Sequence, residues 1–231
     1  MDLKIKDVAE LLNISETTVR RWLGEGKIPA YRLNKQYRFS RAEIEDWLLQ
    51  QRLDPAPGEE VKKAEAGNMQ FSLYRALYRG DVLVDLEGAS KEEIIRNTML
   101  EMGRRFDLDP EVLTDLFLDR EKMMSTALSH GVAVPHTRDF LLDTHYDVTM
   151  IVYPKIPLDY SALDGQPVHT LFFLFASADR NHLNLLAKVA HLTSHDKSRA
   201  FFQTKPCKER LLDYIKHWES TLGSYTHSTS R

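Results

Sequence analysis

Apolar residues at helical spacing predict three helices in the first fifty residues. Asp7 and Glu10 form a capping-box-like pair at the start of the first helix, and Ser15 caps the second. Ser40 begins the third helix. The positions expected to be buried are Val8, Leu11 and Leu12, then Val19, Trp22 and Leu23, and then Ile44, Trp47 and Leu48. The tight turn between the first two helices predicts a helix-turn-helix.

Two stretches rich in turn residues follow this helical pattern. IPAYRLNKQYRF (28–39) contains two strand-like runs around Asn34 and Lys35, which predict a β-hairpin because asparagine tolerates positive φ. Residues 53–68, LDPAPGEEVKKAEAGN, combine prolines, glycines and charges and predict a flexible linker. We therefore expect one unit at 1–52, a second at 69–220 and a polar tail at 221–231.

The second unit alternates between strand-like and helical patterns, which predicts an α/β fold. Strands are expected at 82–88, within GVAVPH (131–136), at 148–154 and at 168–177. Helices are expected at 91–106, from Pro110 onward, from about Asn181 onward, and at 196–203 and 206–218. The helix after Pro110 should bury Val112, Leu113, Leu116 and Phe117. The almost continuously apolar run at 168–177 is typical of a strand covered on both faces.

The composition excludes several classes of protein. The 231 residues are 42 % hydrophobic with a net charge of −3, which gives no sign of a nucleic-acid coat or a membrane-surface protein. A single cysteine, Cys207, allows no intrachain disulfide. The charged start of the chain is unlike a signal peptide, and the longest apolar run, LFFLFA, is too short to cross a bilayer. We expect a cytoplasmic protein without membrane insertion.

Two histidines stand where strands end and helices begin, which is where α/β domains bind ligands. His136 follows the strand GVAV, and Pro135 fixes the direction in which the imidazole leaves the strand. His182 lies in the first turn of a helix, in register with its apolar face, and should point toward the sheet. An uncharged imidazole is a good nucleophile near neutral pH, and helix N-termini favour phosphate. The pair therefore suggests phosphoryl transfer through His136.

The opposite face of the same helix carries Asn184, Lys188 and His191, and we expect His191 to be exposed to solvent. His191 and His195, at i and i+4, could together bind a metal, but no third ligand is evident. We therefore expect neither a metal nor a cofactor.

Residues 3–50 resemble the excisionase and MerR-like winged helix-turn-helix family, over nearly the whole first unit. The resemblance implies that the second helix enters the major groove and that the hairpin contacts the DNA backbone. The residues that it implies face DNA are Thr17, Thr18, Arg20, Arg21, Arg32, Lys35, Tyr37 and Arg38. Residues 1–52 carry ten basic and eight acidic side chains, so the net charge is only +2. The alternative is therefore a fold whose basic residues are merely solvated or bind protein. One copy covers a half-site, which favours a homodimer.

Three blocks of the second unit carry another resemblance: REKMMSTALSHGVAVPH (120–136), IPLDYSALDGQPV (156–168) and HLNLLAKVAHL (182–192). They are similar, in order and spacing, to the fructose/mannitol-type and nitrogen-regulatory EIIA domains of the bacterial phosphotransferase system. The resemblance covers about residues 70 to 217 and implies a mixed sheet flanked by helices. It implies that His136 accepts a phosphoryl group from phospho-HPr or its nitrogen-branch homologue. His182 is implied to be the second active-site histidine, Arg120 the active-site arginine, and Ser125 and Thr126 the pair beside the phosphate.

One departure from the family pattern follows the Ser-Thr pair. The family usually has glycines there, whereas this chain has Ala127, Leu128, Ser129 and His130. If close approach of the backbone to phosphate depends on those glycines, phosphorylation could be slowed or lost. The alternative is an EIIA fold kept only as a binding or dimerising module.

The favoured hypothesis is an EIIA-like phosphocarrier coupled to a DNA-binding unit for regulation. One alternative is an EIIA that feeds a separate EIIB and permease in fructose or mannitol uptake. Another is a transcription factor with a non-catalytic EIIA-like sensor. In the favoured hypothesis, either the basic face of residues 20–38 folds onto phosphorylated His136, or like charges split a dimer. Both routes predict weaker DNA binding after phosphorylation, by about 1–3 kcal/mol.

Overall fold

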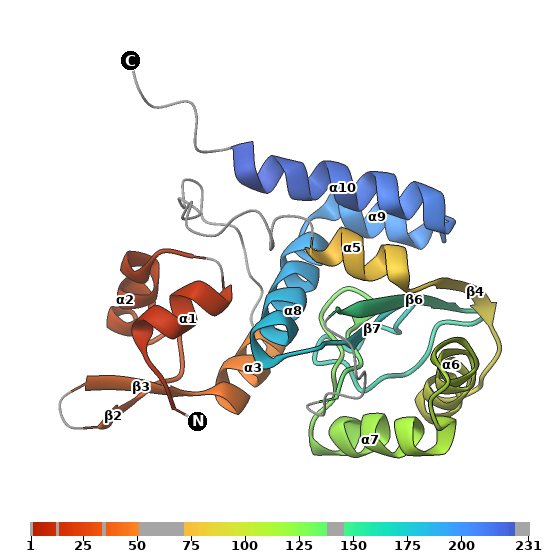
Figure 1. Cartoon of the computed structure of the whole chain (residues 1–231), viewed down its shortest axis with the longest axis horizontal. Coiled ribbons are helices and arrows are strands. Elements are labelled where there is room, and N and C mark those ends of the chain that lie inside the picture. Colours follow the sequence, from red (N-terminus) through yellow and green to blue (C-terminus); the bar gives the residue numbers. More distant parts are fainter. Residues whose placement is uncertain (1, 13, 34–35, 51–71, 138–145, 225–231) are drawn as a thin grey trace.

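A computed structural model describes residues 2–12, 14–33, 36–50, 72–137 and 146–224 (Figure 1). The predicted linker at 53–68 and the predicted DNA contact Lys35 lie outside the described residues. The boundaries at 52 and 69 therefore stay predictions.

The first unit has the predicted helix-turn-helix and hairpin. Helices α1 (Ile5–Leu12) and α2 (Glu16–Gly24) precede strands β2 (Tyr31–Leu33) and β3 (Gln36–Ser40), and α3 (Arg41–Gln50) follows. Strand β1 (Asp2–Leu3) pairs with the other edge of β3. Ser15 caps α2, as predicted: its hydroxyl accepts a hydrogen bond from Thr18 N at 3.0 Å. The predicted Asp7–Glu10 cap is wrong, because α1 begins earlier and Asp7 accepts from Lys4 N instead, at 2.8 Å.

The second unit is built on a four-stranded mixed sheet with the order β4-β6-β7-β5. Its strands are β4 (Val82–Leu86), β5 (Val132–Ala133), β6 (Val148–Pro154) and β7 (Thr170–Phe175). Strands β4 and β6 are parallel, β5 and β7 are parallel, and β6 and β7 are antiparallel. Every residue of β6 and β7 is buried, as the apolar run of β7 predicted.

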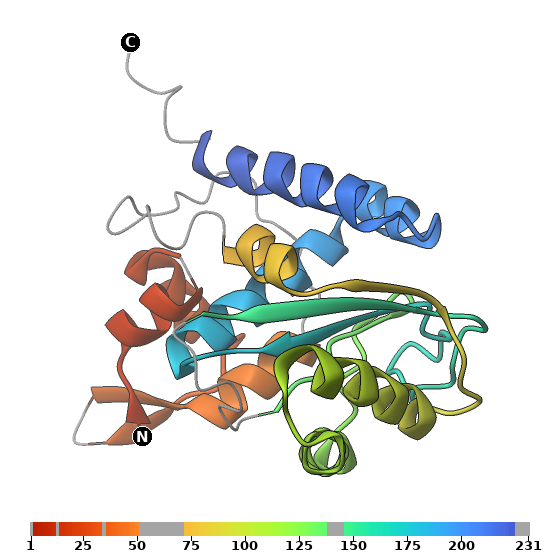
Figure 2. The same cartoon turned by 45° about the vertical axis from the view of Figure 1, so that its right-hand side comes forward.

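Helices cover both faces of this sheet (Figures 1 and 2). One face packs against α6 (Lys91–Phe106) and α7 (Pro110–Met123), the other against α5 (Ser72–Arg79), α9 (Asp196–Gln203) and α10 (Lys208–Ser224). Alternate residues of β6 point to opposite faces: Met150 and Val152 pack in the core beneath α6 and α7, and Ile151 and Tyr153 pack in the other. Helix α8 (Asp179–Ser194) lies between the sheet and the first unit.

Several predicted details of the second unit are wrong. Helix α5 was not predicted, and α10 continues to Ser224, beyond the expected end of the unit at 220. In α7, Val112 is 52 % exposed because Thr114 occupies the buried face instead. The strand at GVAVPH is ladder-paired only over Val132–Ala133, although an isolated bridge pairs His136 with Leu174.

His191 on the outer face of α8 is only partly exposed and not fully exposed as expected, and α5 and α10 cover much of this face. Ser72 of α5 donates a hydrogen bond to Asn184 Oδ1 at 2.9 Å, and Lys188 pairs with Glu219 of α10. Polar residues on this face therefore hold three helices together through buried contacts, which a helical pattern alone does not distinguish from solvated positions.

Candidate functional site

His136 lies beside β7, where Leu174 N donates to Pro135 O at 3.0 Å. Its side chain is completely buried, and its Nδ1 atom lies 2.7 Å from Val134 O. A carbonyl oxygen accepts only, so this contact favours the tautomer with its proton on Nδ1. The lone pair of a neutral ring is then on Nε2, which makes Nε2 the nucleophilic atom.

His182 meets His136 as the sequence predicted. It lies in the first turn of α8, where its amide donates to Ala178 O at 3.0 Å, and its side chain is 1 % exposed. The two ring centroids are 5.0 Å apart. The structure thus brings together two histidines that are 46 positions apart in the chain (182 minus 136).

Arg120 completes the predicted trio. It lies near the end of α7, and its Nε donates to His136 Nε2 at 3.1 Å. Its Nη1 donates to Met124 O at 3.0 Å, which holds the guanidinium in place. A fixed guanidinium beside Nε2 is suited to offset negative charge on a phosphoryl group there.

Ser125 and Thr126 follow α7 directly, but their hydroxyls are engaged elsewhere. Ser125 Oγ donates to Tyr160 O at 2.7 Å, and Thr126 Oγ1 donates to Glu121 Oε2 at 2.6 Å. Burial raises the pKa of Glu121, against the effect of the hydrogen bonds from Thr126. Glu121 was missed by sequence reasoning, although its place next to Arg120 could have suggested a positioning role. Contact of Ser125 and Thr126 with phosphate stays a prediction.

The segment with Ala127 to His130 forms a narrow turn beside the site. Leu128 N donates to Val132 O at 2.7 Å, and Ala127 pairs with Ala133 in an antiparallel bridge. His130 and Gly131 both have positive φ, 66° and 76°. The turn therefore forms without glycine at 130, although a non-glycine residue in this conformation costs about 1 kcal/mol.

Glu45 of α3 is the residue that sequence reasoning missed altogether. Its Oε1 atom lies 2.7 Å from His136 Nε2 and 3.0 Å from His182 Nε2, and its side chain is 0 % exposed. Beside it, Asp46 Oδ1 lies 3.3 Å from Arg120 Nη2. The first unit thus places two carboxylates against the three predicted active-site residues. No local pattern in α3 could have indicated this, because the contacts join distant positions in the chain. Glu45 lies about ninety residues or more from both histidines, and Asp46 lies 74 positions from Arg120.

The protonation of this cluster follows from its hydrogen bonds. Burial by itself raises the pKa of Glu45, but hydrogen bonds with His136 and His182 hold that pKa well below its usual range. Burial lowers the pKa of His136 to about 4, against the opposing effect of Glu45. A neutral His136 carries one proton, for which Val134 O and Glu45 Oε1 compete. A proton drawn to Nε2 by Glu45 leaves that atom without a nucleophilic lone pair.

Glu45, His136 and His182 are also the one group within the described residues that could hold a metal ion, with ligand atoms within 4.8 Å of one another. Two histidines and a carboxylate suit zinc. However, Arg120 Nε donates to the same His136 nitrogen that would bind the ion. A guanidinium at 3.1 Å would repel a divalent cation, so the arrangement fits an anion better.

The predicted DNA-facing residues divide into two groups. Thr17, Arg20, Arg21 and Arg32 are exposed, and Tyr37 and Arg38 are partly exposed. Thr18 does not face outward as expected: it is 7 % exposed, and its hydroxyl lies 2.9 Å from Ser15 Oγ within the cap of α2. Arg32 lies over the Tyr37 ring at 5.0 Å.

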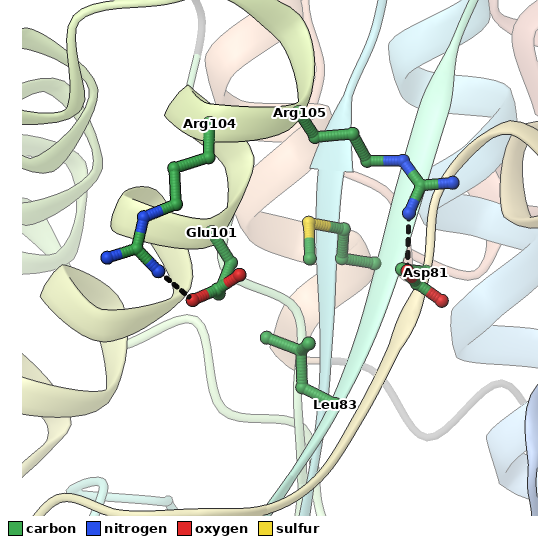
Figure 3. Close-up of a pocket in the computed structure, with 6 residues that line it drawn as sticks. Asp81, Leu83, Glu101, Arg104 and Arg105 are labelled. Carbon is green, nitrogen blue, oxygen red and sulfur yellow. Dashed lines mark hydrogen bonds and ion pairs between the residues drawn. The ribbon is translucent and has the colours of Figure 1, made fainter.

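Two further features lie apart from the site. A hollow between α6 and the sheet is lined by Asp81, Leu83, Glu101, Arg104, Arg105 and Met150 (Figure 3). Its charged groups pair with one another, Arg104 with Glu101 and Arg105 with Asp81, so none is aimed at a ligand. His191 and His195 lie with ring centroids 5.1 Å apart, beside Trp218.

Among the described helices, none combines the length and apolar character needed to cross a membrane.

Comparisons with known proteins agree with both resemblances. Residues 77–218 match the family described as phosphoenolpyruvate-dependent sugar phosphotransferase system, EIIA 2, and residues 3–52 match a helix-turn-helix domain family. A nitrogen regulatory protein of Pseudomonas aeruginosa is 29 % identical over 146 residues, which cover 62 % of this chain and 94 % of that protein.

Two other relatives extend the comparison. The crystal structure of the nitrogen regulatory protein IIA-Ntr from Neisseria meningitidis superposes with a TM-score of 0.56 at 26 % identity, covering 62 % of this chain and 98 % of that one. The transcriptional repressor DcmR of Methylorubrum extorquens is 42 % identical over 60 residues, which cover 24 % of this chain and 23 % of that protein. The chain therefore belongs to the EIIA type-2 family of the phosphotransferase system, joined to an N-terminal helix-turn-helix domain.

Proposed function

We propose that the chain is a regulatory phosphocarrier that accepts a phosphoryl group on His136 and carries a DNA-binding unit. The observation that supports this most directly is the position of His136 Nε2, which has Arg120 Nε at 3.1 Å and the ring of His182 beside it. Nucleophile, guanidinium and second imidazole are the groups that phosphoryl transfer to a histidine requires.

In the proposed step, the lone pair of His136 Nε2 attacks the phosphorus of a phosphohistidine donor, phospho-HPr or its nitrogen-branch homologue. The bond between phosphorus and the donor imidazole breaks as the bond to Nε2 forms. The donor imidazole, already protonated on its other nitrogen, leaves with the electron pair as a neutral ring. Arg120 and His182 offset charge on the phosphoryl oxygens, while Val134 O keeps the proton on Nδ1.

The regulatory part of the proposal rests on the N-terminal unit. The exposed residues of α2 and the hairpin, among them Arg20, Arg21 and Arg32, would contact duplex DNA in a cytoplasmic setting. The neighbouring nitrogen regulatory proteins favour a regulatory branch over sugar uptake. An EIIB domain or a regulated protein is the expected recipient of the phosphoryl group.

Incubation with phosphoenolpyruvate, enzyme I and HPr homologues, followed by intact-mass measurement, tests the acceptor. The chain should gain one phosphoryl group that is labile in acid and stable in alkali, and His136→Ala should abolish the gain. His182→Ala should still accept the group, but slowly. Undiminished labelling of His136→Ala would contradict the assignment, and no labelling of any form would favour a non-catalytic sensor.

A further inference from the structure

The phosphoacceptor site is covered by the first unit of the same chain. His136 is 0 % exposed and His182 is 1 % exposed, and the carboxylate nearest to both belongs to α3. A donor protein cannot reach Nε2 in this arrangement. We propose that the acidic face of α3, Glu45 and Asp46, is an internal ligand of the phosphoacceptor site and competes with the phosphoryl donor for it. This inference rests on the proposed acceptor role of His136.

The charges of the two surfaces are complementary. The second unit contributes Arg120 and two imidazoles, which suit a phosphoryl group. The first unit places two carboxylates against them. Glu45 Oε1 lies 2.7 Å from His136 Nε2, the atom that phosphorus would have to approach. Asp46 lies 3.3 Å from the Nη2 atom of Arg120. Carboxylate oxygens thus take the places that phosphoryl oxygens would need.

The burial of Glu45 shows that the contact is close-packed. A glutamate is almost never fully buried unless it is paired, and Glu45 is 0 % exposed. Its hydrogen bonds to His136 and His182 both cross between the two units. The neighbouring Ile44 and Trp47 are instead part of a buried apolar cluster that also contains Val8 and Val19 of the first unit. Helix α3 thus packs into the apolar cluster with one face and contacts the acceptor site with the other.

Apolar contacts extend the interface beyond the charges. Both α1 and α3 contact α8, and in both views α3 lies along α8 (Figures 1 and 2). One continuous apolar cluster contains Leu11 and Leu48 of the first unit together with Leu183 and Leu186 of α8. Docking of the first unit therefore buries apolar surface as well as the acidic pair, and it holds the carboxylates in place.

Docking and phosphorylation exclude each other for two reasons. Glu45 occupies the space in front of Nε2, so transfer to His136 requires that α3 first move away. A phosphoryl group adds up to about two negative charges, which would then repel Glu45 and Asp46. Phosphorylation should therefore hold the first unit in the undocked position.

Glu45→Lys tests the inference in the full chain, with Glu43→Lys as the control. Glu43 lies on the same helix and is exposed, so it gives the same charge change away from the site. Lysine at 45 would face Arg120 and both histidines and should undock α3. We expect Glu45→Lys to be phosphorylated at His136 about tenfold faster than the unchanged chain, and Glu43→Lys at the unchanged rate.

Hydrogen exchange of amides in α3 and α8 provides a second measurement that needs no phosphoryl transfer. Exchange should accelerate in Glu45→Lys and in the phosphorylated chain, and stay unchanged in Glu43→Lys. Unaltered exchange in Glu45→Lys would overturn the inference, whether or not His136 is phosphorylated. Equal phosphorylation rates for all three forms would also overturn it, while leaving the acceptor role of His136 intact. If the faster exchange or phosphorylation of Glu45→Lys appeared only with added zinc and was lost with a chelator, the cluster would be a metal site. That result would overturn the inference as well.

Discussion

At the scale of single residues, the environment of each histidine decides what its imidazole can do. His136 is fully buried and His191 is partly buried, and burial lowers the pKa of each to about 4. Around His136 the carbonyl of Val134 and the carboxylate of Glu45 compete for the one proton of the neutral ring, and their balance decides whether Nε2 has a free lone pair. His191 has aromatic neighbours instead, so its neutral form matters only for stability.

His191 should make stability depend on pH. Burial, reinforced by the charge of His195, lowers its pKa to about 4, so the folded chain binds this proton less readily than the unfolded chain does. The free energy of unfolding should fall as the pH drops from about 6.5 to about 4, by at most about 3 kcal/mol from this residue. Urea unfolding at pH 7 and pH 4.5 measures the difference. His191→Gln should reduce that difference, and an unchanged difference would contradict the assignment.

Arg20 and Arg21 should matter for DNA binding. Arg20→Ala and Arg21→Ala are each expected to weaken duplex binding and to lower the salt slope by about 1 per lost phosphate contact. If one of the two arginines contacts a base, its replacement should weaken binding to the preferred sequence by about 1–3 kcal/mol. The measurement is a titration of genomic fragments at several salt concentrations. Arg96→Ala, at an exposed position of α6, is the control and should bind unchanged. Salt-insensitive binding would indicate a protein-binding unit instead.

At the scale of elements, the caps of α2 and α6 were predictable, the Asp7–Glu10 cap was not, and long-range contacts were missed. The sequence placed α6 at 91–106 and α9 at 196–203 correctly, because Ser90 and the apolar spacing are local signals. It missed α5, which is short and depends on packing against β6, α8 and α10. It also misjudged the outer face of α8, since buried polar pairs look like solvated residues in a helical pattern.

Gly80, directly after α5, tests that packing. A Cβ atom at this position would lie 1.9 Å from Thr149 O, a backbone atom of β6 that cannot move without disturbing the sheet. Gly80→Ala should therefore lower the free energy of unfolding by about 2–3 kcal/mol. Gly24→Ala is the matched control, because nothing lies within 4 Å of its added Cβ. Equal urea midpoints for the two variants would show that α5 can move away from β6 at little cost.

At the scale of the whole molecule, the two units are joined by an acidic helix and not by the basic face. The route in which residues 20–38 fold onto phosphorylated His136 stays a prediction; without a phosphoryl group, α1 and α3 contact α8, and Glu45 and Asp46 lie against the site. The sign of the coupling at this interface changes accordingly: a phosphoryl group would repel the first unit and not attract it. The dimer route to weaker DNA binding stays a prediction.

DNA binding should therefore respond little to phosphorylation at a single half-site. Thr17, Arg20 and Arg21 are exposed while α3 is docked, so docking does not cover the proposed recognition surface. For a duplex long enough for one unit, the affinities of the unmodified and phosphorylated chains should agree within about twofold. The reason is that DNA binds the docked and undocked forms equally well, so undocking does not change its affinity. Titration of this duplex with both forms of the chain at fixed salt measures the two affinities. A tenfold loss on this short duplex would contradict the docked geometry, whereas a loss only on a two-site duplex would support dimer control.

Much of this protein was determined by its sequence alone, because the relevant signals are local. Turn residues, caps and apolar periodicity gave the helix-turn-helix, the order of strands and helices, and His136 at the end of its strand. The resemblance to EIIA domains was enough to name His182 and Arg120 beside it. Only the tertiary structure decided that Glu45 lies between the two histidines. In the sequence Glu45 is one acidic residue on an ordinary helix, and its role depends on which surface that helix meets, which the docking of two separately folded units determines.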